Sequence, residues 1–143
     1  MIDLYQLVEA KAYGADVILL IAECLAKEQA ELLAKDAKIL GMEVLMEIHN
    51  EEELAKLNDF VDIVGINNRD LRTFEVDIET SVRLGKLIPD RFVKISESGL
   101  SGAKEIHYLR ENGFKGFLIG ETFMKTDNPG EACRKFIEGL KRK

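Results

Sequence analysis

Four apolar segments of the chain end in side chains that could transfer protons or bind an anion. Each segment is rich in Val, Ile, Leu or Phe, and each is followed by a carboxylate, an amide, a guanidinium or a glycine. In chain order these groups are Glu47 after EVLM, Asn67 and Arg69 in INNR, Glu97, Ser98 and Gly99 after VKIS, and Gly120 and Glu121 after FLI. A carboxylate can accept or deliver a proton, and an arginine can pair with a carboxylate or a phosphate.

Residue parity predicts which of these groups share a face. Side chains alternate along a strand, so Glu47 lies on the face of Leu45, and Glu97 lies on the face of Ile95. If that face lines a barrel, both glutamates point into its mouth. Partial loss of solvent there raises the pKa of a carboxyl group toward the range useful for proton transfer. Lys94 has the opposite parity to Glu97, so we expect it outside the mouth.

The small residues after the last two strands favour a phosphate site. Backbone N–H groups can converge on an anion where no side chain blocks them, as at Ser98, Gly99 and Gly120. Each signal alone has an ordinary explanation, because a glutamate at a strand end is usually solvated and a glycine or an Asn-Asn pair often only makes a turn. Four successive strand ends with complementary chemistry favour a functional site.

The two histidines give no signal for a metal site. His49 stands beside a strand end and His107 lies inside a helical pattern. Neither has an obvious cysteine or carboxylate partner at the spacing that metal ligands require. We therefore expect no metal site.

Five apolar segments predict the strands that position these groups. They cover residues 17–22, 43–48, 62–67, 91–96 and 116–120. Helical patterns cover residues 3–14, 27–41 and 101–113, a segment that starts after Asn50, and a last helix that opens at Asn128 and Pro129 and ends among Lys141, Arg142 and Lys143. Glycines at 14, 41 and 113 are placed to end three of these helices.

The alternation of strand and helix predicts an α/β protein with a parallel sheet. Two architectures remain open, a doubly wound sheet and a (β/α)₈ barrel. No strand is followed by GxGxxG or GxxxxGK[ST], which argues against the usual dinucleotide and P-loop sites. In both architectures the functional groups lie at the carboxyl ends of the strands.

Composition narrows the class of protein. The 143 residues, 46% hydrophobic and 32% charged, predict one globular domain over residues 1–143. A net charge of −6 with interleaved signs argues against a nucleic-acid partner. No apolar run approaches the roughly 20 residues that span a bilayer, so we expect no membrane partner. The two cysteines, Cys24 and Cys133, and the lack of a secretory signal favour the cytoplasm.

Four ordered motifs of the sequence resemble one enzyme family. MEVLMEIHNEEEL, DIVGINNRDLRTFEVD, VKISESGL and FLIGETFMKTDNPGEA are similar to segments of indole-3-glycerol phosphate synthase. The resemblance implies a partial TIM-type barrel of about five βα units, corresponding to strands four to eight. It also implies a carboxy-lyase of tryptophan biosynthesis, which closes the ring of 1-(2-carboxyphenylamino)-1-deoxyribulose 5-phosphate with loss of carbon dioxide and water. The family uses no metal or organic cofactor.

The resemblance also implies roles for individual residues. Glu47 matches the catalytic glutamate, which assists proton transfer. The substrate-binding positions are Asn67, Arg69 and Glu97, and the phosphate-binding positions are Ser98, Gly99, Gly120 and Glu121. Some family members have serine at the position of Glu121. At this position we expect only the backbone N–H to serve, because a carboxylate would repel the phosphate.

The family's chain has three further strands at its beginning, and they carry a general-acid lysine that no motif here replaces. The resemblance therefore implies that this chain alone is inactive. A partial barrel exposes two sheet edges and its inward apolar side chains, so we expect self-association or pairing with the N-terminal strands. Two other functions remain open: a non-catalytic half-barrel that binds phosphate esters, and a phosphosugar isomerase built on Glu47 and Glu97.

Overall fold

The computed structural model describes residues 1–141, and its centre is a parallel sheet whose spatial order follows the sequence. The strands pair in the order β1-β2-β3-β4-β5. Their bounds are β1 Val17–Ile21, β2 Glu43–Ile48, β3 Ile63–Asn67, β4 Val93–Glu97 and β5 Gly116–Leu118. A doubly wound sheet reverses its strand order at a switch point, and this sheet does not. The sequential order is that of a barrel wall.

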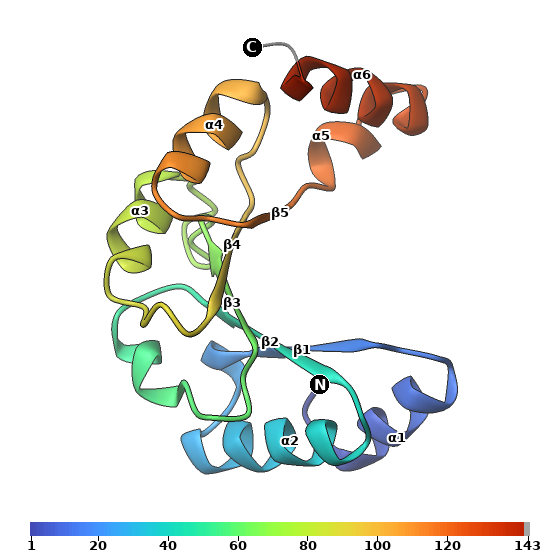
Figure 1. The fold of residues 1–143 in the computed structure, drawn as a ribbon, viewed down its shortest axis with the longest axis vertical. Coiled ribbons are helices and arrows are strands. Elements are labelled where there is room, and N and C mark those ends of the chain that lie inside the picture. Colours follow the sequence, from blue (N-terminus) through green and yellow to red (C-terminus); the bar gives the residue numbers. More distant parts are fainter. Residues whose placement is uncertain (142–143) are drawn as a thin grey trace.

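Helices cover the outer side of this wall. Their bounds are α1 Leu4–Ala12, α2 Lys27–Ile39, α3 Glu79–Gly85, α4 Ala103–Glu111, α5 Glu121–Met124 and α6 Pro129–Lys141, with 3₁₀ turns η1 Ala22–Cys24 and η2 Glu52–Lys56. The sheet curves into an open arc, with α2, α3 and α4 along its outer side and no helix filling its inner side (Figure 1). We call these two sides the convex face and the concave face.

The hydrophobic core lies between the convex face and the helices. Alternate strand residues such as Ile18, Leu20 and Met46 point into this core and are almost completely buried. Residues of the other parity line the concave face, where Val17 is 43% exposed and Leu118 is 47% exposed. The concave face is therefore covered only in part, since Leu45 and Ile95 on the same face are buried.

Local signals start and end the helices largely as the sequence predicts. The Asp3 side chain accepts a hydrogen bond from the Tyr5 N–H at the start of α1, and Asn128 Oδ1 accepts one from the Glu131 N–H at the start of α6. Gly41 and Gly113 adopt positive φ just after α2 and α4, which a residue with a side chain would adopt only with strain.

Three elements differ from the sequence-based expectation. The helix expected after Asn50 is only the 3₁₀ turn η2, and β5 ends at Leu118 rather than at residue 120. The sequence patterns did not locate α3, which follows a loop containing an isolated bridge between Arg69 and Val76. Arg142 and Lys143 lie outside the described residues. No helix within residues 1–141 is long and apolar enough to cross a membrane.

Candidate active site

Strand register brings the predicted glutamates and Asn67 to one end of the concave face. Glu47 lies opposite Gly65 in the β2–β3 pair, and Asn67 lies opposite Glu97 in the β3–β4 pair. The Asn67 Nδ2 atom donates a hydrogen bond of 2.8 Å to Glu47 Oε1. Both glutamates are 7% exposed, so the mouth of the arc holds two buried carboxyl groups.

Glu97 is held close to the backbone of β3. A Cβ atom added to Gly65 would lie 2.0 Å from Glu97 Oε1, so the carboxyl group occupies the space that a side chain at position 65 would need. This oxygen is buried and has no hydrogen-bond partner among the described residues. Burial and the nearby charge of Glu47 raise the pKa of Glu97 to about 7. Glu97 is therefore suited to hold a proton near neutral pH.

Glu47 has the opposite tendency. Burial disfavours its charged form, but contacts with His49 and Asn67 outweigh burial and lower the pKa of Glu47 below its usual value. Two neighbouring carboxyl groups with diverging pKa values can divide acid and base roles between them. In this arrangement Glu47 is the charged acceptor and Glu97 is the group that keeps its proton.

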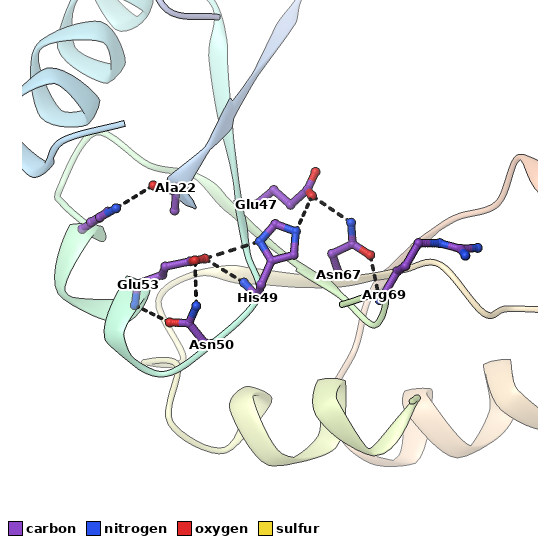
Figure 2. A network of polar contacts seen from close by, with 8 residues as sticks. Ala22, Glu47, His49, Asn50, Glu53, Asn67 and Arg69 are labelled. Atoms are coloured by element: carbon purple, nitrogen blue, oxygen red, sulfur yellow. Dashed lines mark hydrogen bonds and ion pairs between the residues drawn. The ribbon is translucent and has the colours of Figure 1, made fainter. Parts of the chain in front are cut away.

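His49 has two carboxylate partners, which corrects the expectation that it has none. Its Nε2 atom lies 3.1 Å from Glu47 Oε1, and its Nδ1 atom lies 3.5 Å from Glu53 Oε2 (Figure 2). Contacts with Glu47 and then Glu53 raise the pKa of His49 to about 10. The i, i+2 spacing to Glu47 along a strand and the i, i+4 spacing to Glu53 were visible in the sequence as signals of this cluster.

Arg69 links the carboxylate cluster to a neighbouring cavity. Its backbone N–H donates to Asn67 Oδ1 at 3.0 Å, and its Nη2 atom lies 2.7 Å from Glu121 Oε2. The Glu121 carboxylate therefore pairs with Arg69, although the sequence interpretation gave a role only to the Glu121 backbone N–H. A line of hydrogen bonds runs from Glu47 through Asn67 and Arg69 to Glu121.

A cavity of about 440 Å³ lies where the sequence predicts a phosphate site. The predicted residues that line it are Arg69, Glu97, Ser98, Gly99, Gly120 and Glu121. Ser98 and Gly99 both have left-handed backbones, with φ of 65° and 71°. Lys125 also lines the cavity and was missed by the sequence interpretation, because it lies beyond the strand ends, after α5.

A buried amide fixes the loop that carries Ser98. The Asn68 side chain donates to Ser98 O at 3.0 Å and to Ser96 Oγ at 2.9 Å, and its own oxygen accepts from Ser81 Oγ at 2.7 Å. Asn68, Ser81 and Ser96 are all buried. The sequence interpretation treated Asn68 as turn chemistry and gave it no role in holding this loop.

Lys94 lies away from the mouth, as its parity predicts. Its Nζ atom donates to Gly85 O at 3.0 Å and to Asp90 at 3.2 Å. Both partners belong to the segment that packs α3 on the convex face. Lys94 therefore does not reach the two glutamates.

One group of side chains within residues 1–141 has the composition of a metal site. Potential ligand atoms of Glu23, His49 and Glu53 lie within 4.8 Å of one another. Each nitrogen of His49 already faces a carboxylate oxygen, at 3.1 Å from Glu47 and 3.5 Å from Glu53. The cluster is better described as an ion-pair network.

Comparison with known proteins identifies the family of the chain. The family model described as indole-3-glycerol phosphate synthase matches residues 1–136. The chain is 51% identical to the indole-3-glycerol phosphate synthase of Bacteroides thetaiotaomicron over 140 residues, covering 98% of this chain and 54% of that protein. It is 45% identical to that of Acetivibrio thermocellus over 137 residues, covering 95% and 53%. The chain thus spans about half the length of these relatives.

Solved structures agree on the fold. The tryptophan synthase α-subunit of Pyrococcus furiosus matches with a TM-score of 0.72 at 23% identity, over 96% of this chain and 59% of that one. The 3-hexulose-6-phosphate synthase of Salmonella typhimurium matches with a TM-score of 0.79 at 13% identity, over 98% and 69%. These similarities identify the arc as part of a TIM-type (β/α) barrel, as expected. By its sequence, the chain belongs to the indole-3-glycerol phosphate synthase family.

Proposed function

We propose that this chain supplies the strand-four-to-eight part of an indole-3-glycerol phosphate synthase active site. The reaction would close the ring of 1-(2-carboxyphenylamino)-1-deoxyribulose 5-phosphate, with loss of carbon dioxide and water. The proposal depends on one observation: a series of hydrogen bonds runs from Glu47 through Asn67 to Arg69, which lines a 440 Å³ cavity. This series joins a charged proton acceptor to a cavity with two cationic side chains, Arg69 and Lys125.

Each proposed role follows from the local environment. Glu47, charged and buried, would accept a proton during ring closure and dehydration. Glu97, which keeps its proton near neutral pH, would donate a hydrogen bond to the substrate. Ser98, Gly99 and Gly120 would hold the phosphate through backbone N–H groups, with the Arg69 charge beside them. The Glu121 carboxylate would have to turn away from Arg69 as the phosphate enters.

The chain alone is proposed to lack a general acid for the condensation step. Within residues 1–141, no lysine is hydrogen-bonded to Glu47 or Glu97. Lys94 lies on the convex face, and Lys125 lines the neighbouring cavity. We therefore propose that turnover requires a lysine from the first three strands of a family barrel.

An assay for indole formation tests this proposal. The chain would be given the ribulose phosphate substrate alone, and again with a polypeptide that carries the N-terminal half of a family member. We expect no turnover alone and measurable turnover in the mixture, lost with Glu47→Gln. Turnover by the chain alone would refute the requirement for a lysine in trans. No turnover in a mixture shown to form a complex would refute the proposed function.

We propose that the chain binds another polypeptide through the two edges of its sheet and the adjoining concave face. The outer edges of β1 and β5 are unpaired within the sheet, and Leu118 on the concave side of β5 is 47% exposed. We propose that residues 1–143 form one domain that associates through these edges, with itself or with the missing strands. Sedimentation velocity should show mass rising with concentration. Leu118→Lys should reduce this rise, and the control Leu32→Lys on the outer surface of α2 should not.

A non-catalytic phosphate-ester binder is the second candidate. It is favoured by the cavity, whose predicted anion-binding residues all belong to this chain. Calorimetric titration with glycerol phosphate should detect binding that weakens in Arg69→Ala. Binding without turnover, even in the complex with the N-terminal half, would favour this function. No binding by the folded chain would exclude it.

The free thiols of Cys24 and Cys133 fit a proposed cytoplasmic location.

A further inference from the structure

We propose that His49 and Glu53 are positioning residues that hold the Glu47 carboxylate in one orientation and in its charged form. The inference rests on the proposed function for its catalytic consequence, but its structural part can be measured without turnover. Neither residue is among the expected site residues; His49 directly follows β2, and Glu53 lies in η2.

Glu53 is a buried carboxylate that cannot rotate freely. It is 4% exposed. Its Oε2 atom accepts the His49 backbone N–H at 2.8 Å, and its Oε1 atom accepts Asn50 Nδ2 at 2.8 Å. The Glu53 N–H in turn donates to Asn50 Oδ1 at 3.2 Å. These reciprocal bonds close the turn and fix the carboxylate against the imidazole of His49 (Figure 2).

His49 contacts both Glu53 and Glu47, so the fixed carboxylate of Glu53 also limits the orientation of Glu47. The His49 side chain is 9% exposed and lies between the two carboxylates, with Nδ1 facing Glu53 and Nε2 facing Glu47. Neither nitrogen makes a hydrogen bond with a described residue, so the two contacts are ion pairs. A neutral imidazole would turn a lone pair toward one of the carboxylates, whereas the doubly protonated form is attracted to both. The cation then favours the charged form of both carboxylates.

One oxygen of Glu47 is fixed and the other is left for substrate. Oε1 faces His49 Nε2 at 3.1 Å and accepts Asn67 Nδ2 at 2.8 Å. The contacts with His49 and Asn67 both fall on Oε1. The Glu97 carboxyl group is a further hydrogen-bond partner of Glu47 while it holds its proton. The carboxylate is thereby oriented through Oε1, and we propose that Oε2 accepts the proton from substrate. This is how a positioning residue acts on a catalytic base without touching substrate.

Other charged groups around His49 strengthen the same effect. Glu23 of η1 has a carboxylate oxygen within 4.8 Å of the His49 and Glu53 ligand atoms. The charge of His49 also acts on Asp70 in the loop after β3 and on Glu97 of β4. Arg69, Arg72 and Arg83 line the same pocket as His49, but His49 is the cation whose charge lowers the pKa values of Glu47 and Glu97. Without the His49 charge, this pair of glutamates would bind a proton at higher pH.

Carboxyl ¹³C NMR titration of the glutamate-labelled chain tests the inference without any activity. Glu47 and Glu97 are assigned from Glu47→Gln and Glu97→Gln. In His49→Gln we expect the titration of Glu47 to move up by about one pH unit or more, because its cationic partner is gone. Glu53→Gln, which keeps the imidazole but removes its support, should give a smaller shift in the same direction. His107→Gln on α4 is the matched control and should leave both titrations unchanged.

The outcomes separate the inference from the proposed function. An unchanged Glu47 titration in both folded variants overturns the inference, whatever the activity. If His49→Gln does not fold, Glu53→Gln decides alone by the same criterion. In the complex with the N-terminal half, the proposed role predicts a loss of about tenfold or more in kcat with KM little changed, and an acid limb of the pH–rate profile moved to higher pH. A shifted titration without any turnover would retain the inference and count against the proposed function.

Discussion

The two faces of the sheet are made from the same strands but are covered very differently. On the convex face Leu20 of β1 and Met46 of β2 are completely buried under the helices. On the concave face Val17 and Val93 are about half exposed, at 43% and 45%. Because side chains alternate, neighbouring residues of one strand experience these two environments. The hydrophobic core of this chain therefore forms on the face that the helices cover.

Burial on the concave face changes from one end of the strands to the other. Along β4 it deepens from Val93, which is 45% exposed, through Ile95 at 8% to Glu97 at 7%. The carboxyl groups at the mouth are therefore better covered than the valine at the opposite end. The concave face of this chain thus combines exposed apolar side chains at one end of β4 with buried, interacting carboxyl groups at the other.

The largest contrast is expected between two leucine truncations. Leu20→Ala removes a fully buried side chain of the convex face and should lower the free energy of unfolding by about 2–5 kcal/mol. Leu118→Ala on the concave face removes a side chain that is 47% exposed and should cost less than about 1 kcal/mol. Urea unfolding measures both. Equal losses would mean that the concave face is covered in solution, for example by another copy of the chain.

A second contrast concerns pH and the buried acid of the concave face. The pKa of Glu97 is about 7 in the folded state against an ordinary value of 4.5. The folded state thus keeps a proton that the unfolded state has lost, and the stability linked to this proton is full below pH 4.5 and lost as pH rises through about 7. Between pH 5 and pH 8, deprotonation of Glu97 should lower the free energy of unfolding of the wild type by at most about 3 kcal/mol.

Glu97→Gln cannot ionise and should abolish this component of the pH dependence. Its stability relative to the wild type should therefore increase between pH 5 and pH 8, measured by urea unfolding at each pH. Glu28→Gln on the exposed surface of α2 is the control and should follow the wild type. Parallel curves for Glu97→Gln and the wild type would show that Glu97 is not held in its neutral form.

A third contrast compares two glycines: one where an added methyl group would clash with other side chains, and one where it would not. A methyl group at Gly65 would lie 2.0 Å from Glu97 Oε1 and 3.2 Å from Leu45 Cδ1, so Gly65→Ala should cost about 1–3 kcal/mol. A methyl group at Gly139 in α6 would meet nothing within 4 Å, and Gly139→Ala should be neutral or stabilising by helix propensity.

A double mutant identifies the cause of the loss at Gly65. If the clash is with the Glu97 carboxylate, Gly65→Ala should cost less in a Glu97→Ala background, and the two losses should not add. Urea unfolding of the four proteins gives this coupling. Additive losses would place the clash with Leu45 instead.

Strand parity explains which parts of the site the sequence could predict. The period of two along β2 and β4 is fixed by the backbone, so Glu47, Glu97 and the opposite direction of Lys94 followed from counting residues. The motif after each strand likewise located Ser98, Gly99 and Gly120 beside the cavity. Strand order could not be derived this way, since a doubly wound sheet and a barrel have the same local pattern of strands and helices.

Sequence patterns did not predict the side chains that reach the site from turns and short helices beyond the strand ends. Glu53 reaches His49 because the chain after β2 forms the tight turn η2 instead of a regular helix, and spacing alone does not distinguish the two. Lys125 lines the 440 Å³ cavity directly after the four-residue helix α5, a helix that the sequence patterns did not locate. The divergence of the Glu47 and Glu97 pKa values depends on contacts with His49 and Asn67, and these contacts exist only in the folded chain.

The smallest contrast lies within one ion pair at the margin of the convex face. Lys38 of α2 bonds Asp62 at 2.8 Å, and both side chains are about one third exposed, at 37% and 34%. An exposed pair of this kind is worth about 0–1 kcal/mol, so Lys38→Ala should cost no more than that and less at high salt. Asp62→Ala should cost more and remain costly in salt, because Asp62 Oδ2 also accepts the Val44 N–H at 2.9 Å. Urea unfolding at low and high salt measures both variants. Equal, salt-sensitive losses of unfolding free energy in the two variants would show that the bond from Val44 N–H to Asp62 contributes nothing to stability. Water would then replace Asp62 as the partner of this N–H group.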